Sequence, residues 1–136
     1  MNIVSKELFQ NMVRIRREIH MHPELGFQEE NTAAIITEEL KRLGIKATSG
    51  IGKTGVVGQI NPINDAGPVV ALRADMDALA IQEETENKFA SKIDGVIDAC
   101  GHDGYGFINI SVTVPHSILI KMHQSWMKGL LRKQHN

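Results

Sequence analysis

Near the middle of the chain, one apolar run constrains the fold more than any other stretch: Pro68-Val69-Val70-Ala71-Leu72. An apolar run without polar alternation is typical of a strand that is buried on both faces of its sheet. Such a strand needs a layer of structure on each side, and helical and strand-like patterns alternate before it. The sequence therefore predicts a layered α/β domain.

Two amphipathic helices are predicted before this strand. The first, over residues 6–20, has an apolar stripe with helical spacing, formed by Leu8, Met12, Ile15 and Ile19. We expect it to end near Met21, because the residue before Pro23 avoids helical angles. The second has a stripe formed by Ala33, Ile36, Leu40 and Leu43. Asn31 or Thr32 is its predicted cap, and Gly44 its predicted stop.

The polar residues around the end of the first helix are interpreted as exposed. The residues that lie mostly off its apolar stripe, interpreted as a solvated face, are Arg14, Arg16, Arg17 and Glu18. His20 and His22, next to Pro23, are interpreted as surface histidines of a turn and not as a metal motif. Further along, Glu83, Glu84 and Glu86 are interpreted as an acidic, solvated loop.

Two shorter strand patterns, at residues 45–48 and 55–60, lie between the second helix and the buried strand. Between them, Gly50-Ile51-Gly52-Lys53-Thr54 contains the Gly-Lys-Thr of a phosphate-binding loop. Such a loop also needs a glycine at the position of Ala47 and a helix after the threonine. Because neither is present in the pattern, we predict a hairpin turn here.

Composition and charge indicate a soluble globular chain. Of its 136 residues 42% are apolar, and its net charge of −1 gives no bulk attraction to nucleic acid or to an anionic membrane. No apolar run has the roughly 18 residues that a membrane span needs, and the N-terminus lacks the pattern of a signal peptide. The chain has one cysteine, which cannot form an internal disulfide. We therefore expect a cytoplasmic protein without nucleic-acid or membrane partners.

The only cysteine lies in a glycine-rich segment, Asp98-Ala99-Cys100-Gly101-His102-Asp103-Gly104. Gly101 tolerates positive φ, so the backbone can turn sharply enough for the Cys100 thiolate and the His102 imidazole to reach one metal ion. Asp103 is placed to fix the histidine ring as a supporting partner. Two ligands do not complete a catalytic zinc site. The spacing alone leaves two interpretations open, a partial metal site or a buried thiol near a surface histidine.

Two acids follow the buried strand. In open α/β sheets, ligands bind beyond the carboxyl ends of the strands, so Asp75 and Asp77 are well placed for a site. The alternative is that either acid caps the next turn or pairs with Arg73. Position alone does not decide between these interpretations.

Four motifs in the first 104 residues resemble a known family in order and spacing. They are Arg16-Arg17-Glu18-Ile19-His20-Met21-His22-Pro23-Glu24-Leu25-Gly26-Phe27, Thr54-Gly55-Val56-Val57-Gly58, Leu72-Arg73-Ala74-Asp75-Met76-Asp77-Ala78-Leu79 and Ala99-Cys100-Gly101-His102-Asp103-Gly104. The family is that of the zinc- or manganese-dependent amidohydrolases of the aminoacylase and carboxypeptidase type. The most similar branch contains hippurate hydrolases, N-acyl-amino-acid deacylases and indole-acetyl-amino-acid hydrolases. Ala80 stands where that branch usually has proline.

The resemblance implies that residues 1–104 are the N-terminal part of a three-layer α/β/α catalytic domain of the zinc-exopeptidase type. It implies that Cys100 and His102 bind a divalent metal, Zn or Mn, and that Asp75 is a catalytic acid supporting the site. The implied substrate is a small N-acyl amino acid. In this branch the general base is a glutamate of a Glu-Glu pair downstream of the cysteine motif, further histidines complete the metal sites, and an inserted domain supports dimerisation.

Residues 105–136 depart from the family pattern. Tyr105 replaces a histidine, and the segment contains no acid but four Lys and Arg residues, whereas residues 1–104 carry 16 acids against 11 Lys and Arg. We expect an irregular tail, with one strand-like stretch at residues 107–114. One hypothesis is a frameshift near codon 105, which sequencing of the downstream DNA would test.

Without the downstream glutamates and histidines, we expect the chain to be truncated, to bind metal weakly or not at all, and to lack both catalysis and the family's dimerisation domain. The primary functional hypothesis is a metal-dependent hydrolase of amide bonds in N-acyl amino acids. The alternative is a non-catalytic remnant or small binding protein that uses its open sheet edge or its basic tail.

Overall fold

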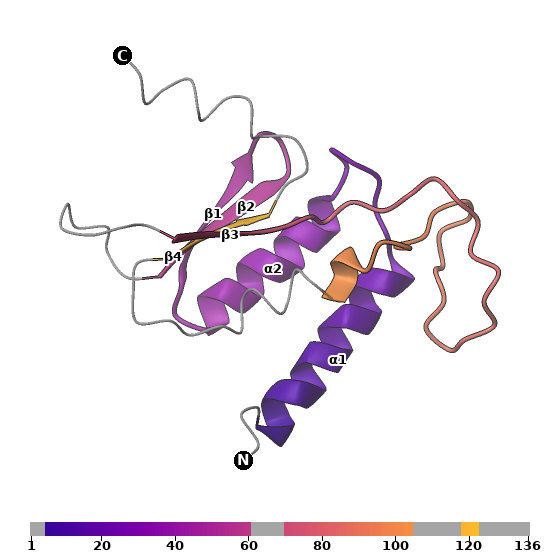
Figure 1. Cartoon of the computed structure of the whole chain (residues 1–136), viewed down its shortest axis with the longest axis horizontal. Helices are drawn as coiled ribbons and strands as arrows, with labels where there is room; N and C mark the ends of the chain where they lie inside the picture. Colours follow the sequence, from indigo (N-terminus) through magenta and orange to yellow (C-terminus); the bar gives the residue numbers. More distant parts are fainter. Residues whose placement is uncertain (1–4, 61–69, 105–117, 123–136) are drawn as a thin grey trace.

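The computed structural model describes residues 5–60, 70–104 and 118–122, which form the helices α1 and α2, a short helical turn at residues 102–104 and a four-stranded sheet (Figure 1). In chain order the elements are α1 (Lys6–Met21), α2 (Glu30–Arg42), β1 (Lys46–Ile51), β2 (Gly55–Ile60), β3 (Val70–Ala74) and β4 (Ile118–Met122). The sheet order is β1-β2-β4-β3. Neither described helix combines the length and the apolar character needed to cross a bilayer.

The predicted hairpin is confirmed, because β1 and β2 pair antiparallel on either side of the turn that contains Lys53. The strand β4 lies between β2 and β3, antiparallel to β2 and parallel to β3. A strand therefore forms within residues 105–136, a segment that the sequence predicts to be irregular. The stretch at residues 107–114, predicted to be a strand, lies outside the described residues.

The two predicted helices are confirmed, but the second begins differently from the prediction. Ser5 caps α1 by accepting a hydrogen bond from the Leu8 N–H at 3.1 Å. At the start of α2, the carboxylate of Glu24 accepts from the N–H groups of Asn31 at 2.9 Å and Thr32 at 2.8 Å. The cap is thus a carboxylate from the preceding turn, which also suits the positive end of the helix dipole.

The core lies between α2 and one face of the sheet. Its buried members are Ala33, Ile36, Leu40, Val56, Ala74 and Met76. Gly58 lets α2 approach β2 closely, because a Cβ atom there would lie 3.0 Å from Cδ2 of Leu40. Leu43, predicted to share the apolar stripe, is 40% exposed because it follows the last helical residue. Gly44 then reverses the chain with a φ of 72°, as predicted.

The prediction that β3 is buried on both faces holds for one face only. Ala74 is buried and Leu72 packs against the core, but Ala71 and Arg73 are exposed on the other face. Both described helices lie on the same side of the sheet (Figure 1). The described residues therefore form the sheet and one helical layer of the predicted α/β/α arrangement.

Glu39 joins the two helices, and its ionisation is expected to make the stability depend on pH. Its carboxylate is buried and accepts hydrogen bonds from Arg42 at 2.9 Å and 2.5 Å and from Asn11 of α1 at 2.8 Å. The hydrogen bonds from Arg42 and its charge outweigh burial and lower the pKa of Glu39 below its ordinary value of 4.5. The contribution of ionised Glu39 to the free energy of unfolding is therefore complete above pH 4.5 and is lost as the pH falls through the folded-state pKa of Glu39.

Chemical unfolding of the wild type and of Glu39→Gln, measured between about pH 7 and about pH 3, checks this expectation. The difference in free energy of unfolding between the two proteins should shrink as the pH falls. A difference that stays constant over this range would contradict the assignment.

Candidate metal centre

The segment of residues 98–104 is folded around the carboxylate of Asp98. Its Oδ1 accepts from the N–H groups of Gly101 at 2.9 Å and His102 at 3.1 Å, and its Oδ2 accepts from the N–H of Asp103 at 2.5 Å. Gly101 has a φ of 77°, so the predicted glycine bend is present. Asp98 is buried. The motifs do not predict this role of Asp98, although an aspartate shortly before a glycine is a known turn signal.

The ring of His102 is oriented by Asp77, which follows soon after the end of β3. Its Nδ1 lies 2.8 Å from the backbone oxygen of Asp77 and 3.4 Å from Oδ1 of the same residue. A carbonyl oxygen can only accept a hydrogen bond, so Nδ1 carries the proton in the neutral ring. The lone pair is then on Nε2. This is the arrangement in which a protein holds a metal-ligating histidine, with its other ring nitrogen bonded to a backbone carbonyl or carboxylate.

Cys100 is exposed and lies two residues before His102 in the same segment. Thiolate sulfur and imidazole nitrogen are the donors that zinc prefers. Within residues 5–60 and 70–104, no three His, Cys, Asp or Glu side chains form a group able to hold a metal ion. Cys100 and His102 therefore fit a metal as two of its ligands, and not as a complete site.

The two acids after β3 have different surroundings. Oδ1 of Asp75 accepts hydrogen bonds from Nε of Arg73 at 2.9 Å and from Nη2 at 2.8 Å, which is the pairing left open by the sequence. Asp77 is buried and contacts the ring of His102 instead. Of the two acids, Asp77 is thus the one that contacts a predicted ligand, and a catalytic role for Asp75 stays a prediction.

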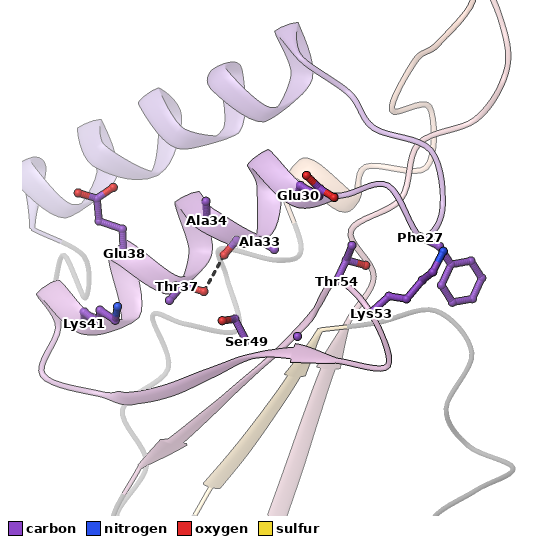
Figure 2. Close-up of a pocket in the computed structure, with 11 residues that line it drawn as sticks. Phe27, Glu30, Ala33, Ala34, Thr37, Glu38, Lys41, Ser49, Lys53 and Thr54 are labelled. Atoms are coloured by element: carbon purple, nitrogen blue, oxygen red, sulfur yellow. Dashed lines mark hydrogen bonds between the residues drawn. The ribbon is translucent and has the colours of Figure 1, made fainter.

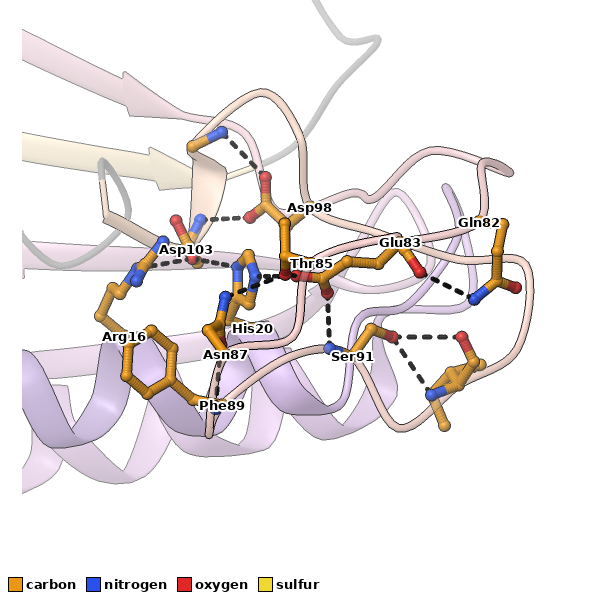
Figure 3. Close-up of polar contacts among 12 residues, drawn as sticks. Arg16, His20, Gln82, Glu83, Thr85, Asn87, Phe89, Ser91, Asp98 and Asp103 are labelled. Atoms are coloured by element: carbon orange, nitrogen blue, oxygen red, sulfur yellow. Dashed lines mark hydrogen bonds and ion pairs between the residues drawn. The ribbon is translucent and has the colours of Figure 1, made fainter.

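Asp103 is buried against α1, where it pairs with two residues that the sequence pattern predicts to be exposed (Figure 3). Its Oδ2 lies 2.8 Å from Nε of Arg16 and 2.8 Å from Nδ1 of His20. Burial and the nearby charge of Asp98 raise the pKa of Asp103, while Arg16 and His20 oppose that rise. His20 is only 6% exposed, so the prediction of a surface histidine was wrong.

The loop after β3 folds back onto the end of α1, which also corrects the interpretation of Glu83. Its Oε2 accepts from the Ser91 N–H at 2.6 Å, its Oε1 accepts from the Thr85 hydroxyl, and Nε2 of His20 lies 3.6 Å from that oxygen. The hydrogen bond from the Ser91 N–H is the main cause that lowers the pKa of Glu83. Glu84 and Glu86 are exposed, as predicted.

A groove of about 880 Å³ lies between α2 and the β1–β2 hairpin, away from this centre (Figure 2). It is lined by Phe27, Glu30, Ala33, Ala34, Thr37, Glu38, Lys41, Ser49, Gly50, Lys53 and Thr54. Nζ of Lys53 lies 5.7 Å from the ring centroid of Phe27, a cation–π contact at one end of the groove. None of the lining residues is among the predicted site residues.

The comparisons with known proteins point to one family. Residues 71–112, which include Cys100 and His102, match the model of peptidase family M20/M25/M40, and the match continues past residue 104. The chain is 52% identical over 125 residues to IAA-amino acid hydrolase ILR1-like 2 of Arabidopsis thaliana, with 92% of this chain and 27% of the relative covered. It is 40% identical over 131 residues to N-acetylcysteine deacetylase of Bacillus subtilis, with 96% and 33% covered.

The fold agrees with the sequence matches. The structure superposes on a solved Bacillus subtilis protein described as a dinuclear metal-binding peptidase from the M20 family, with a TM-score of 0.77 and 36% identity. The superposition covers 87% of this chain and 36% of that one. The resemblance drawn from the four motifs and the predicted α/β class are thus confirmed. The chain spans about a quarter to a third of the length of the two curated relatives named above.

Proposed function

We propose, from the premise that the chain belongs to the M20/M25/M40 peptidase family, that it carries two metal ligands of a metal-dependent amide hydrolase. The ligands are Cys100 and His102. The observation that carries this proposal is the hydrogen bond from Nδ1 of His102 to the backbone oxygen of Asp77 at 2.8 Å. It leaves Nε2 as the donor atom of His102, two residues after the exposed Cys100.

The proposed substrate class is that of N-acyl amino acids and related small amides. Relatives whose names state hydrolysis of an amino-acid conjugate and deacetylation of N-acetylcysteine support this class. A divalent metal, for which we propose Zn or Mn, would when bound polarise the carbonyl of the substrate and lower the pKa of a water molecule. This chain contributes the two donors and the carbonyl of Asp77 that fixes one of them. Asp75 is proposed as the supporting acid at the end of β3.

The 136-residue polypeptide is proposed to be inactive by itself. Amide hydrolysis needs a general base within reach of the attacking water and the leaving amine. In the branch that the motifs resemble, this base is a downstream glutamate, and residues 105–136 contain no acid. Because the described residues offer two proposed ligands and not the three of a catalytic zinc site, metal binding should also be weak.

The position of β3 in the sheet supports the alternative of a non-catalytic binding protein. Within the described part of the chain, β3 is an outer strand of the sheet. An edge strand presents unpaired backbone groups that can pair with another chain. A longer relative added to the purified protein would form a mixed complex in sedimentation if this alternative holds.

Titration with Co²⁺, followed by the absorption of thiolate-bound cobalt, tests the metal assignment. The wild type should show a weak, saturable signal, and Cys100→Ser should remove it. His22→Gln is the matched control, because His22 contacts Glu18 of α1 and is not a proposed ligand. A signal that survives in Cys100→Ser, or one lost equally in His22→Gln, would refute the assignment. Hydrolysis of an N-acetyl amino acid by metal-loaded protein would refute its inactivity.

A further inference from the structure

We infer that His20 of α1 is a positioning residue of the metal centre, which holds the ligand-bearing loop in place through Asp103. The inference deepens the proposed function, because the loop it concerns carries Cys100 and His102. The two partners are 83 residues apart in the chain and meet at 2.8 Å, between Nδ1 of His20 and Oδ2 of Asp103. Both side chains are buried.

The contact acts next to a ligand. Asp103 directly follows His102, and its N–H is bonded to Asp98, whose other oxygen holds the N–H groups of Gly101 and His102. The backbone of the loop is therefore one hydrogen-bonded unit. Any movement of Asp103 away from α1 must move His102 with it.

His102 and Asp103 attach this unit to the rest of the domain from two sides. His102 is bonded to the chain just after β3 through the backbone oxygen of Asp77, and Asp103 is bonded to α1. Metal ligands need to be held within about half an ångström of their working geometry by the residues behind them. The separation between α1 and the end of β3 thus sets where Nε2 of His102 lies.

The charges around Asp103 explain why this attachment needs His20. Asp103 is only 2% exposed and lies near the acidic Asp98, so its carboxylate requires donors to replace water. Arg16 supplies one at 2.8 Å, and its guanidinium also lies 5.9 Å from the ring centroid of Phe89. The side chain of Arg16 is 42% exposed, whereas the side chain of His20 is 8% exposed. His20 is therefore the donor that is fixed inside the domain.

The test compares His20→Ala and the milder His20→Gln, whose amide can still donate to Asp103, with Asn11→Ala. Asn11 is the control because it also links α1 to another element, through Glu39 of α2, and its other hydrogen bonds come from Arg14 of α1 itself. The first readout is hydrogen exchange of the amides of residues 101–103 in the metal-free, full 136-residue chain. His20→Ala should speed this exchange by about tenfold or more, which corresponds to a local opening made easier by roughly 1.4 kcal/mol. His20→Gln should restore much of the protection.

The second readout is the Co²⁺ affinity of the same variants. Loss of a residue that supports a ligand typically lowers metal affinity by about 10- to 100-fold, and His20→Ala should fall in that range while Asn11→Ala does not. Unchanged exchange at residues 101–103 in His20→Ala, or an equal change in Asn11→Ala at the same loss of global stability, would overturn the inference. Should His20→Ala be unfolded, His20→Leu, which keeps most of the side-chain volume but cannot donate to Asp103, takes its place in both readouts and is compared with His20→Gln. If exchange responds but Cys100→Ser leaves metal binding intact, the proposed function fails and the positioning role stands.

Discussion

Replacing Leu40 with alanine is expected to lower the free energy of unfolding by about 2–5 kcal/mol, the usual cost of truncating a fully buried leucine. Leu40 is 0% exposed and lies at the contact between α2 and β2, where its Cδ atoms approach Gly58. Gly58 has no side chain that could move into the space left by the removed atoms of Leu40. The cavity should therefore persist, which places the expected loss in the upper half of that range.

Leu43→Ala is the matched control, because the same side chain is removed at the end of the same helix from a residue that is 40% exposed. Urea unfolding of both variants should give a loss for Leu43→Ala of less than about 1 kcal/mol. Equal losses in the two variants would mean that α2 does not pack on the sheet through Leu40.

The helical periodicity predicts most of this packing from the sequence. The stripe that contains Ala33, Ile36 and Leu40 is the face that α2 buries. The periodicity fails at Leu43, because it cannot show that the helix ends one residue earlier. It also fails at the start of α2, where the cap comes from Glu24, seven and eight residues before the groups it binds. Local capping rules consider side chains within about one turn and miss such a partner.

The apolar run of β3 shows a different limit. Its composition predicts burial on both faces, whereas Ala71 is exposed. A sequence pattern reports the surroundings in which a strand is stable, but it does not supply the layer that covers the strand. In the described residues the second helical layer is not present, so the second face of β3 remains open.

The candidate metal centre was predictable where it is local. Cys100, Gly101 and His102 are neighbours, and the expected bend appears as the positive φ of Gly101. The contact between His20 and Asp103 was not predictable, since charged and polar residues usually lie on the surface and no periodic pattern links residues 83 positions apart. The family motifs contain both residues, but a motif does not state which of its members touch.

Asp98→Ala is expected to destabilise the domain by about 3 kcal/mol and to release the loop that carries the proposed ligands. The buried carboxylate accepts three backbone hydrogen bonds, and each hydrogen bond to a charged group contributes roughly 1.5–3 kcal/mol. The sum is reduced because removing Asp98 also removes a negative charge beside Asp103. Asp98→Asn should be intermediate, because its one oxygen can still accept from Gly101 and His102, while its amide nitrogen cannot accept from Asp103.

Asp94→Ala is the control for this prediction, because Asp94 is exposed in the same segment and its loss should change stability by no more than about 0.5 kcal/mol. The measurements are urea unfolding and hydrogen exchange at residues 101–103. If the exchange of these amides is the same in Asp98→Ala and Asp94→Ala, the loop is not held by Asp98, and the orientation of His102 must come from Asp77 alone. A graded response from Asp94→Ala through Asp98→Asn to Asp98→Ala would instead show that the turn and the ligand geometry depend on one carboxylate.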